Sequence, residues 1–462
     1  MKKKKRDNKI IKFEEEQEPP HFRKLKENAR KISIVEGSAA SFSGGLGQSY
    51  ITPFALALNA QPIHIGFLSS FSGLVAPITQ LIGNKMMEKY SRKKIVLTFV
   101  FLQSLMWLVI ASLAYLFWID YFQTYLPIVL IILYSIFLGL QGLVHPAWFT
   151  WMGDIIPAEQ RGKYFSSRNR ITGSIGLIAF LAGAFILDAF KTRGFVLLGF
   201  IILFSLAFLG RFVSFLLFKK QFSPRFKIRK KDYFSFTSFL KAFDNYGKYA
   251  TYSALLYFAL MITGPFFAVY MLNELNFSYV SFTIVSMSGS IFYLIFNPLA
   301  GKFSDKYGNA KLLWIANALF LLSPLPWIFL KSPISLIFSA QLIAGIANAA
   351  FLIGQTNFTY DSVTPRHRGI CVAYKGLLVG IGTFFGSILG GLIIKFAPLA
   401  FTQAFFLIII ISVILRLTIG LSFLPFLKDE RKVERLPPMK IDITHPFKTI
   451  NGEIGWFRNV FG

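Results

Sequence analysis

Long stretches without a charged residue constrain this chain more than any other feature. Residues 95–119 read IVLTFVFLQSLMWLVIASLAYLFWI and contain no Asp, Glu, Lys or Arg. A helix of about 20 apolar residues is long enough to cross the hydrocarbon core of a bilayer. Similar windows recur along the 462 residues, of which 15% are charged, against roughly 25% in soluble domains. The sequence therefore predicts an all-α polytopic membrane protein.

Hydropathy predicts twelve transmembrane helices. Their expected positions are 34–60, 63–87, 94–119, 126–153, 169–190, 194–218, 250–272, 278–303, 311–330, 333–359, 370–395 and 399–426. The first is rich in Ser and Gly, as expected of a helix packed closely inside a bundle. A re-entrant loop is the alternative for that segment.

The basic residues predict the orientation. The loops after the second, fourth, eighth and tenth expected helices hold clusters of Lys and Arg, whereas the opposite loops offer only Lys191, Arg193, Lys331 and Lys395. Basic loops stay on the cytoplasmic side, so we expect both termini in the cytoplasm and the protein in the plasma membrane. A positive-inside topology also favours a basic chain, so the net charge of +27 does not require a nucleic-acid partner.

A basic segment divides the chain into two halves. We expect a cytoplasmic tail at 1–33, a six-helix bundle at 34–218, a linker at 219–249, a second six-helix bundle at 250–426 and a cytoplasmic tail at 427–462. The linker could form a helix on the membrane surface, or it could be solvated. The apolar side of such a helix would hold Phe234, Phe236, Phe239, Leu240 and Phe243.

Two loops occur in both halves in the same order. Glu88, Lys89, Tyr90 and Lys94 match Asp305, Lys306, Tyr307 and Lys311 at one constant offset. Asp154, Arg161, Gly162 and Arg168 match Asp361, Arg368, Gly369 and Lys375 at a second offset, ten residues smaller. Because two loops agree, the halves are expected to be parallel structural repeats, an arrangement found in transporters.

These loops resemble those of the major facilitator superfamily. The family's loop signature stands here as Gly301, Asp305, Lys306, Gly308 and Lys311. The first-half copy departs from it, because Glu88 replaces the Asp and Ser91 the second Gly. The family's arginine within the fourth helix also has no match. The resemblance implies two pseudo-symmetric six-helix bundles and a secondary transporter that works by alternating access.

Polar residues expected at mid-membrane depth are candidates for binding a small-molecule substrate, since polar groups are costly there. They are Gln48, Gln141, His145, Tyr257, Ser290, Tyr293 and Asn348. Each could instead bond a neighbouring helix. A co-transported proton or cation is a further possibility, with His145 and Glu36 as the candidate proton carriers.

The family resemblance also implies a cytoplasmic gate, in which the loop acid of one half meets the start of a helix in the other half. Asp305 would approach Arg168 and Arg170, and Glu88 would approach Lys375. The gate candidates are Glu88, Gly301, Asp305, Lys306, Gly308, Arg161, Arg168, Arg170, Arg368 and Lys375. The alternative is that each acid pairs only within its own half.

Other classes of function have less support in the sequence. A membrane enzyme would need a convergent catalytic set, and no His-Glu-x-x-His, Gly-x-Ser-x-Gly or phosphate-loop motif is present. A transporter-like receptor or scaffold without flux is the other alternative. Because Cys371 is the only cysteine, an intrachain disulfide and a multi-cysteine metal site are ruled out. We expect no cofactor or metal, no catalysis, a monomer, and lipid and solute as the partners.

Overall fold

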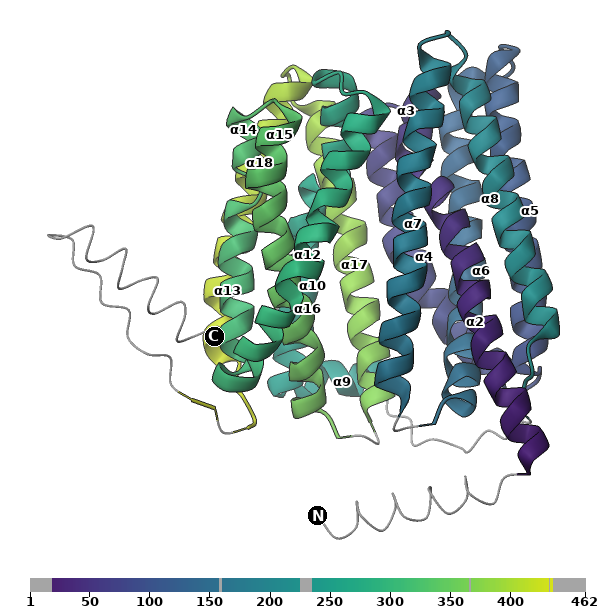
Figure 1. Ribbon diagram of the computed structural model, residues 1–462. Coiled ribbons are helices and arrows are strands. Elements are labelled where there is room, and N and C mark those ends of the chain that lie inside the picture. The colour runs from purple at the N-terminus through teal and green to yellow at the C-terminus, as the bar shows by residue number, and fades with distance from the viewer. Residues whose placement is uncertain (1–18, 158–159, 225–234, 365–366, 432, 435–462) are drawn as a thin grey trace, which may run out of the picture. The chain divides into compact units, whose positions relative to one another are not determined.

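The computed structural model describes residues 19–157, 160–224, 235–364, 367–431 and 433–434. These residues form helices joined by short turns, with no β-strand among them (Figure 1). Within this part of the chain, eleven helical segments are long and apolar enough to cross a membrane. The prediction of an all-α multi-pass membrane protein is therefore confirmed.

The first helix differs most from its expected position. α2 (Pro20–Leu46) begins within the segment that we expected to be a tail, and the short elements η1 (Gln48–Tyr50) and α3 (Ile51–Ala57) follow it. Pro20 occupies the first turn, where proline's missing N–H costs nothing. The first turns are rich in Lys and Arg, so hydropathy could not find them, and α2 is not among the eleven apolar segments.

The other helices of the first half lie close to their expected positions. They are α4 (Pro62–Met86), α5 (Arg92–Trp118), η2 (Gln123–Tyr125), α6 (Leu126–Ile155), α7 (Arg161–Lys191) and α8 (Val196–Lys220). The second half contains α9 (Phe236–Ala242), α10 (Asn245–Thr263), α11 (Phe266–Val269), η4 (Tyr270–Glu274), α12 (Tyr279–Tyr307), α13 (Asn309–Leu322), α14 (Pro326–Phe329), α15 (Pro333–Leu336), η5 (Ile337–Gln341), α16 (Leu342–Ser362), α17 (Arg368–Phe396), α18 (Phe401–Phe423) and η6 (Leu424–Phe426).

The chain divides into two compact units. Unit 1 comprises residues within 1–51, 78–123 and 136–229, and unit 2 comprises those within 52–77, 124–135 and 230–462. In unit 1, α2 packs against α7 and α8, and α5 packs against α8. In unit 2, α10 packs against α17 and α18, while α16 lies beside α12 and α13 (Figure 1). Each unit has its own buried core of aromatic and aliphatic side chains.

A stripe of glycines on α17 explains how closely α10 approaches it. A Cβ at Gly382, Gly386 or Gly390 would collide with α10 backbone carbonyls that are themselves four residues apart. The glycines recur every four residues and so lie on one face of α17. Small residues of this kind let two helix backbones come together. The contact fixes α10, which carries several residues of the candidate site.

Matching contacts confirm the repeat in three dimensions. Arg161, at the start of α7, donates hydrogen bonds to carbonyl oxygens eight and five residues earlier in the chain, at 2.6 and 3.2 Å. Arg368, at the start of α17, donates to carbonyl oxygens at the same two separations, both at 3.1 Å. The two arginines thus tie the preceding loop to the following helix in the same way.

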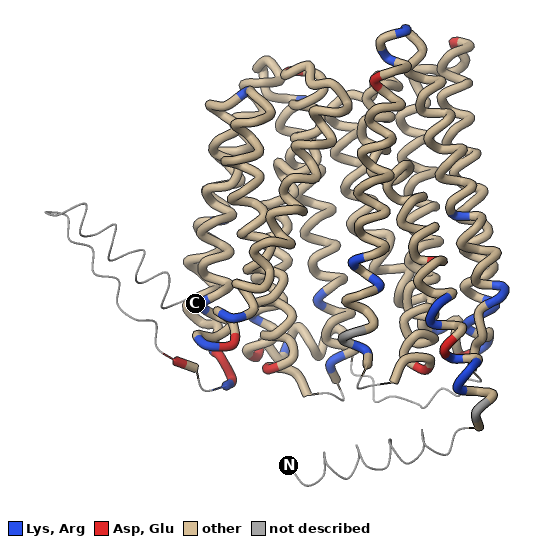
Figure 2. The backbone as a smooth tube through the Cα atoms, in the orientation of Figure 1, with Lys and Arg blue, Asp and Glu red and all other residues tan. Residues whose placement is uncertain are grey.

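In each unit most Lys and Arg residues gather at one end of the helices, which we call the basic end (Figure 2). The short helix α9 lies in the expected linker. Its Phe239 is buried against Tyr246 and Tyr374, whereas Leu240 and Phe243 are 43% and 48% exposed. α9 is therefore anchored on the bundle by one side. Phe234 lies outside the described residues.

Candidate functional site

Three interrupted helices of unit 2 meet around one cavity. The seventh span breaks at Gly264 and Pro265 and ends in the π-helical turn η4. The ninth span breaks after α13, where Ser323 and Pro324 follow. The tenth begins with α15 and the π-helical turn η5, which ends at Gln341. Interrupted helices and π-turns recur at binding sites in membrane transporters.

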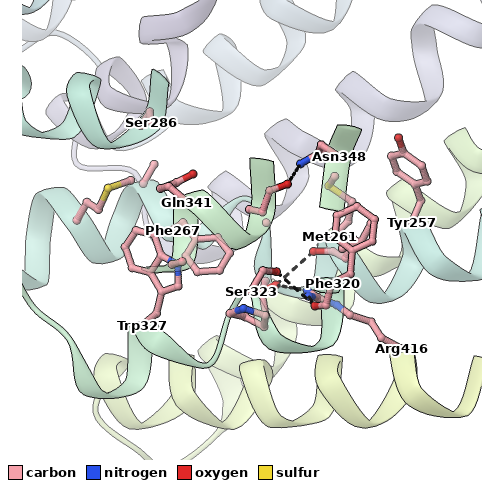
Figure 3. A pocket seen from close by; sticks show the side chains of 18 of the residues that line it. Tyr257, Met261, Phe267, Ser286, Phe320, Ser323, Trp327, Gln341, Asn348 and Arg416 are labelled. Carbon is pink, nitrogen blue, oxygen red and sulfur yellow. Dashed lines mark hydrogen bonds between the residues drawn. The ribbon is translucent and has the colours of Figure 1, made fainter. Parts of the chain in front are cut away.

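The cavity has a volume of about 570 Å³ and lies within unit 2, a size in the usual range for small-molecule sites. Aromatic residues form much of its wall, among them Phe267, Phe320, Trp327 and Phe351. The polar groups that line it are Tyr257, Thr263, Ser286, Ser323, Gln341, Asn348 and Arg416 (Figure 3). An apolar wall with a few polar groups is typical of a site that both holds and orients a small solute.

Two residues singled out from the sequence line this cavity. Tyr257 extends from α10 and packs its ring against Phe351, 6.1 Å between centroids. Asn348 on α16 is exposed, and its amide donates to the Ala344 carbonyl at 2.8 Å. Figure 3 shows both at the same side of the cavity. Ser290 and Tyr293 lie on α12 and are not among the lining residues.

The remaining candidates lie in unit 1. The Gln48 amide donates to Gln141 Oε1 at 3.2 Å, so the structure brings these two predicted residues together. His145 follows Gln141 by four residues on α6, is exposed, and stacks its ring on Phe149. Gln141, His145 and Phe149 therefore share one face of α6.

The sequence reasoning missed five polar residues of the cavity, namely Thr263, Ser286, Ser323, Gln341 and Arg416. Gln341 has room because Gly289 faces it, where a Cβ would come within 2.6 Å of its Oε1. A signal for Arg416 was present, since it is the only charged residue within the apolar run from Phe401 to Phe426. An intramembrane ionisable residue is a candidate functional group by default.

The basic end of unit 1 is held by charge pairs within the unit. Arg92, the first residue of α5, pairs with Asp154 on α6 at 2.7 Å and also donates to the Thr150 carbonyl at 3.0 Å. Arg168 pairs with Glu36 at 3.4 Å and lies over the Trp148 ring. Glu36, one of the candidate proton carriers, is buried and also accepts a hydrogen bond from Ser214 at 2.8 Å.

In unit 2, the residues after the last helix hold the basic end. We call residues 428–431, 433 and 434 the C-terminal strap. Asp429 accepts hydrogen bonds from the backbone N–H groups of Asn309 and Ala310, at 2.7 and 3.1 Å, and so caps the start of α13. Gly308, with a φ of +103°, permits both the turn and the approach of Asp429, which a Cβ would block. The Gly308 expected from the loop signature therefore has a direct structural reason.

Arg431 of the strap binds the loop acids. It pairs with Asp305 at 3.8 Å and Asp361 at 3.6 Å, and it donates to the Ser304 carbonyl. In the repeat, Asn309 stands where Arg92 stands in the first half, since each begins its helix. The side-chain amide of Asn309 donates a hydrogen bond to Asp361 at 2.8 Å, but this amide carries no charge. The strap thus supplies to Asp361 the cation that Arg92 supplies to Asp154.

The other gate candidates have varied surroundings. Lys375 donates to Gln355 at 3.0 Å and lies near the Tyr249 ring. Glu88 and Arg170 are exposed, and Lys306 accepts a backbone hydrogen bond from Glu434. A Cβ at Gly301 would meet nothing within 4 Å in the structure. Among the described residues, no close helix contact therefore requires a glycine at this position.

Within the described ranges, no group of three or more His, Cys, Asp or Glu is arranged to hold a metal ion. The site in unit 2 consists of a solute-sized cavity, interrupted helices and polar groups inside an apolar bundle. These are the features of a solute carrier.

The sequence matches the Major Facilitator Superfamily twice, over residues 37–247 and 249–458. The chain therefore belongs to this family, as the two repeated loops indicated, and it is a membrane transporter built from two six-helix repeats. It is also 31% identical over 98 residues to an uncharacterized transporter of Schizosaccharomyces pombe. That match covers 21% of this chain and 17% of the relative.

Solved structures share the fold at low sequence identity. A bacterial homologue of the iron transporter ferroportin, in an inward-facing state, matches with a TM-score of 0.66 and 15% identity, over 86% of this chain and 98% of that one. A point mutant of the nucleoside transporter NupG gives 0.63 and 17%, over 86% and 100%. A D-xylose–proton symporter gives 0.63 and 15%, over 90% and 100%.

Proposed function

We propose that this transporter binds its solute in the unit 2 cavity and carries it across the membrane by alternating access. The observation that carries the proposal is the meeting of three interrupted helices around a cavity of about 570 Å³ that presents Tyr257, Gln341 and Asn348. Aromatic rings and amides together suit a small solute with both an apolar body and polar groups. Gln48 and Gln141, on the first half, are proposed as further substrate contacts.

Thiol accessibility tests alternating access even while the substrate is unidentified. Asn348→Cys in a Cys371→Ser background would place one thiol in the cavity wall. A membrane-impermeant methanethiosulfonate should react with it when added to right-side-out vesicles and also to inside-out vesicles. The Cys371→Ser parent is the matched control. Reaction from one side only would contradict alternating access. A scaffold, or a membrane enzyme open to one side, predicts that one-sided result.

Orientation and gating complete the proposal. We propose that both termini lie in the cytoplasm and that the membrane is the plasma membrane, since the basic ends then lie inside. Asp305 is proposed to leave Arg431 and approach Arg168 or Arg170 when the cytoplasmic side closes. Asp305→Asn should then shift the population inward by about 1–3 kcal/mol, the usual size of a coupling free energy. A disulfide between cysteines at 305 and 168 that forms in no state would remove this gate.

We also propose a coupling ion, the release of the solute without chemical change, and a monomeric state. A proton or cation could travel with the solute, and His145 is the first residue to test, since its ordinary pKa lies near physiological pH. Uptake that loses its pH dependence in His145→Gln would support this role. We propose a lipid-embedded monomer that releases its solute unchanged, so chemically altered solute in proteoliposomes would favour an enzyme.

A further inference from the structure

A buried arginine forms part of the cavity wall. Arg416 lies in the middle of α18, is 2% exposed, and is one of the lining residues. Its guanidinium donates to the Phe320 carbonyl at 2.6 Å and to the Thr263 hydroxyl at 3.2 Å, so both acceptors are neutral. Its Nε has no hydrogen-bond partner among the described residues. In Figure 3 the side chain reaches towards Phe320 and Ser323.

In the part of the chain that the structure describes, no carboxylate of the second six-helix bundle pairs with Arg416. Between residues 245 and 426 the sequence contains three acids, Glu274, Asp305 and Asp361. Glu274 binds Thr402 at the end of the bundle opposite the basic end. Asp305 and Asp361 are at the basic end, bound to Arg431. Arginines inside a membrane protein are expensive and normally face a partner or a pathway.

The equivalent arginine of the first half does have an acid nearby. Arg211 lies fifteen residues after the first residue of α8, as Arg416 lies fifteen residues after that of α18. Arg211 donates to Gln103 at 2.7 Å and to Ser214 at 3.3 Å. The Ser214 hydroxyl in turn donates to Glu36 at 2.8 Å. The repeat therefore retains the arginine in both halves but provides an acid only in the first.

We propose that the transported solute is a small organic anion, and that Arg416 is its counter-ion in the cavity. This inference rests on the proposed function, because it takes the unit 2 cavity as the solute site. An anion at the Nε edge would complete the hydrogen bonds of the guanidinium and neutralise its charge. The aromatic wall of Phe267, Trp327 and Phe351 would hold an apolar body of the same solute.

A matched series of probes tests whether the cavity prefers a negatively charged ligand. Benzoate, benzamide and benzylamine have similar shapes and carry negative, zero and positive charge. The thermal unfolding temperature of the purified protein in neutral detergent should rise with benzoate, and benzoate should bind at least about tenfold more tightly than the other two, as expected for a charge-assisted bond. Arg416→Gln should remove this preference, whereas Arg416→Lys should retain part of it. If Arg416→Gln does not fold, the probe series on the wild type and Arg416→Lys decides.

A second variant separates this inference from the proposed function. Ala344→Trp fills the cavity without changing its charge, since Ala344 lines it. If benzoate binding is lost in Ala344→Trp and in Arg416→Gln, both proposals are supported. If all three probes bind equally and Ala344→Trp abolishes them, the cavity remains the site and the anion proposal is wrong. If benzoate binds undiminished in Ala344→Trp, the cavity is not the site, and both fail.

A lipid headgroup could supply the same negative charge. Nanodiscs of phosphatidylcholine, with and without phosphatidylglycerol, distinguish the two sources. A soluble anion as occupant predicts equal benzoate affinity in both. Stabilisation by phosphatidylglycerol through Arg416, with no benzoate binding in phosphatidylcholine, would overturn the proposal. Absence of benzoate binding in every membrane would overturn it as well.

Discussion

Replacing Arg431 should loosen the basic end of unit 2. Arg431→Gln removes the pair with Asp305, whose side chain is 77% exposed, and such a pair contributes about 0–1 kcal/mol. It also removes the pair with the half-buried Asp361 and the bond to the Ser304 carbonyl. A hydrogen bond from a charged group contributes about 1.5–3 kcal/mol. Together these contacts stabilise the strap on the bundle by about 2–3 kcal/mol, after discounting the exposed pair.

Hydrogen exchange would measure this change locally. Asp429 of the strap protects the backbone amides of Asn309 and Ala310 from exchange, because it accepts their hydrogen bonds. When the strap opens they lose that acceptor, so their exchange in Arg431→Gln should accelerate by roughly 30- to 150-fold, the ratio that corresponds to about 2–3 kcal/mol. The matched control is Arg193→Gln, an exposed arginine of the loop between α7 and α8, which should leave these amides unchanged.

The repeat provides a rescue. Asn309→Arg in the Arg431→Gln background would place a cation at the start of α13, as Arg92 does at the start of α5. Asp361 should then regain a charged partner within the bundle, and the unfolding temperature should recover. Asn309→Arg alone should not stabilise the protein, because Arg431 already occupies that position beside Asp361. A double variant no more stable than Arg431→Gln would refute the equivalence of Arg92 and Arg431.

Three further predictions follow from the structure. Gly308→Ala should lower stability by more than about 1 kcal/mol, because a positive φ strains alanine and its Cβ would meet Asp429; unchanged unfolding would contradict this. Gln48→Ala and Gln141→Ala each remove the same hydrogen bond, worth about 0.5–1.5 kcal/mol, so their effects on solute affinity should not add; additive effects would mean independent roles. A reporter after Lys219 should read cytoplasmic and one after Glu274 external, and a cytoplasmic signal at Glu274 would invert the proposed topology.

The fold could be predicted well from the sequence because length and hydropathy identify membrane helices. It failed at the start of α2, whose first turns are charged, and it missed the three helix interruptions that form the cavity. Tyr257 and Asn348 could be selected by depth alone, whereas Ser290 and Tyr293 have the same depth but lie outside the cavity lining. The rotation of a helix about its axis depends on packing, as with the glycine stripe of α17, and a single sequence does not record it.

The capping of α13 by Asp429 has a consequence for biosynthesis. Asn309 and its acceptor Asp429 are 120 residues apart, and a ribosome adds about 5–20 residues per second. The start of α13 therefore waits roughly 6–24 s for its cap at that rate. During that interval three more membrane segments must be inserted. A translational stall, an early stop or a bulky fusion placed directly after α18 should leave this turn open, so expressed chains that retain residues 428–434 should give better-folded protein.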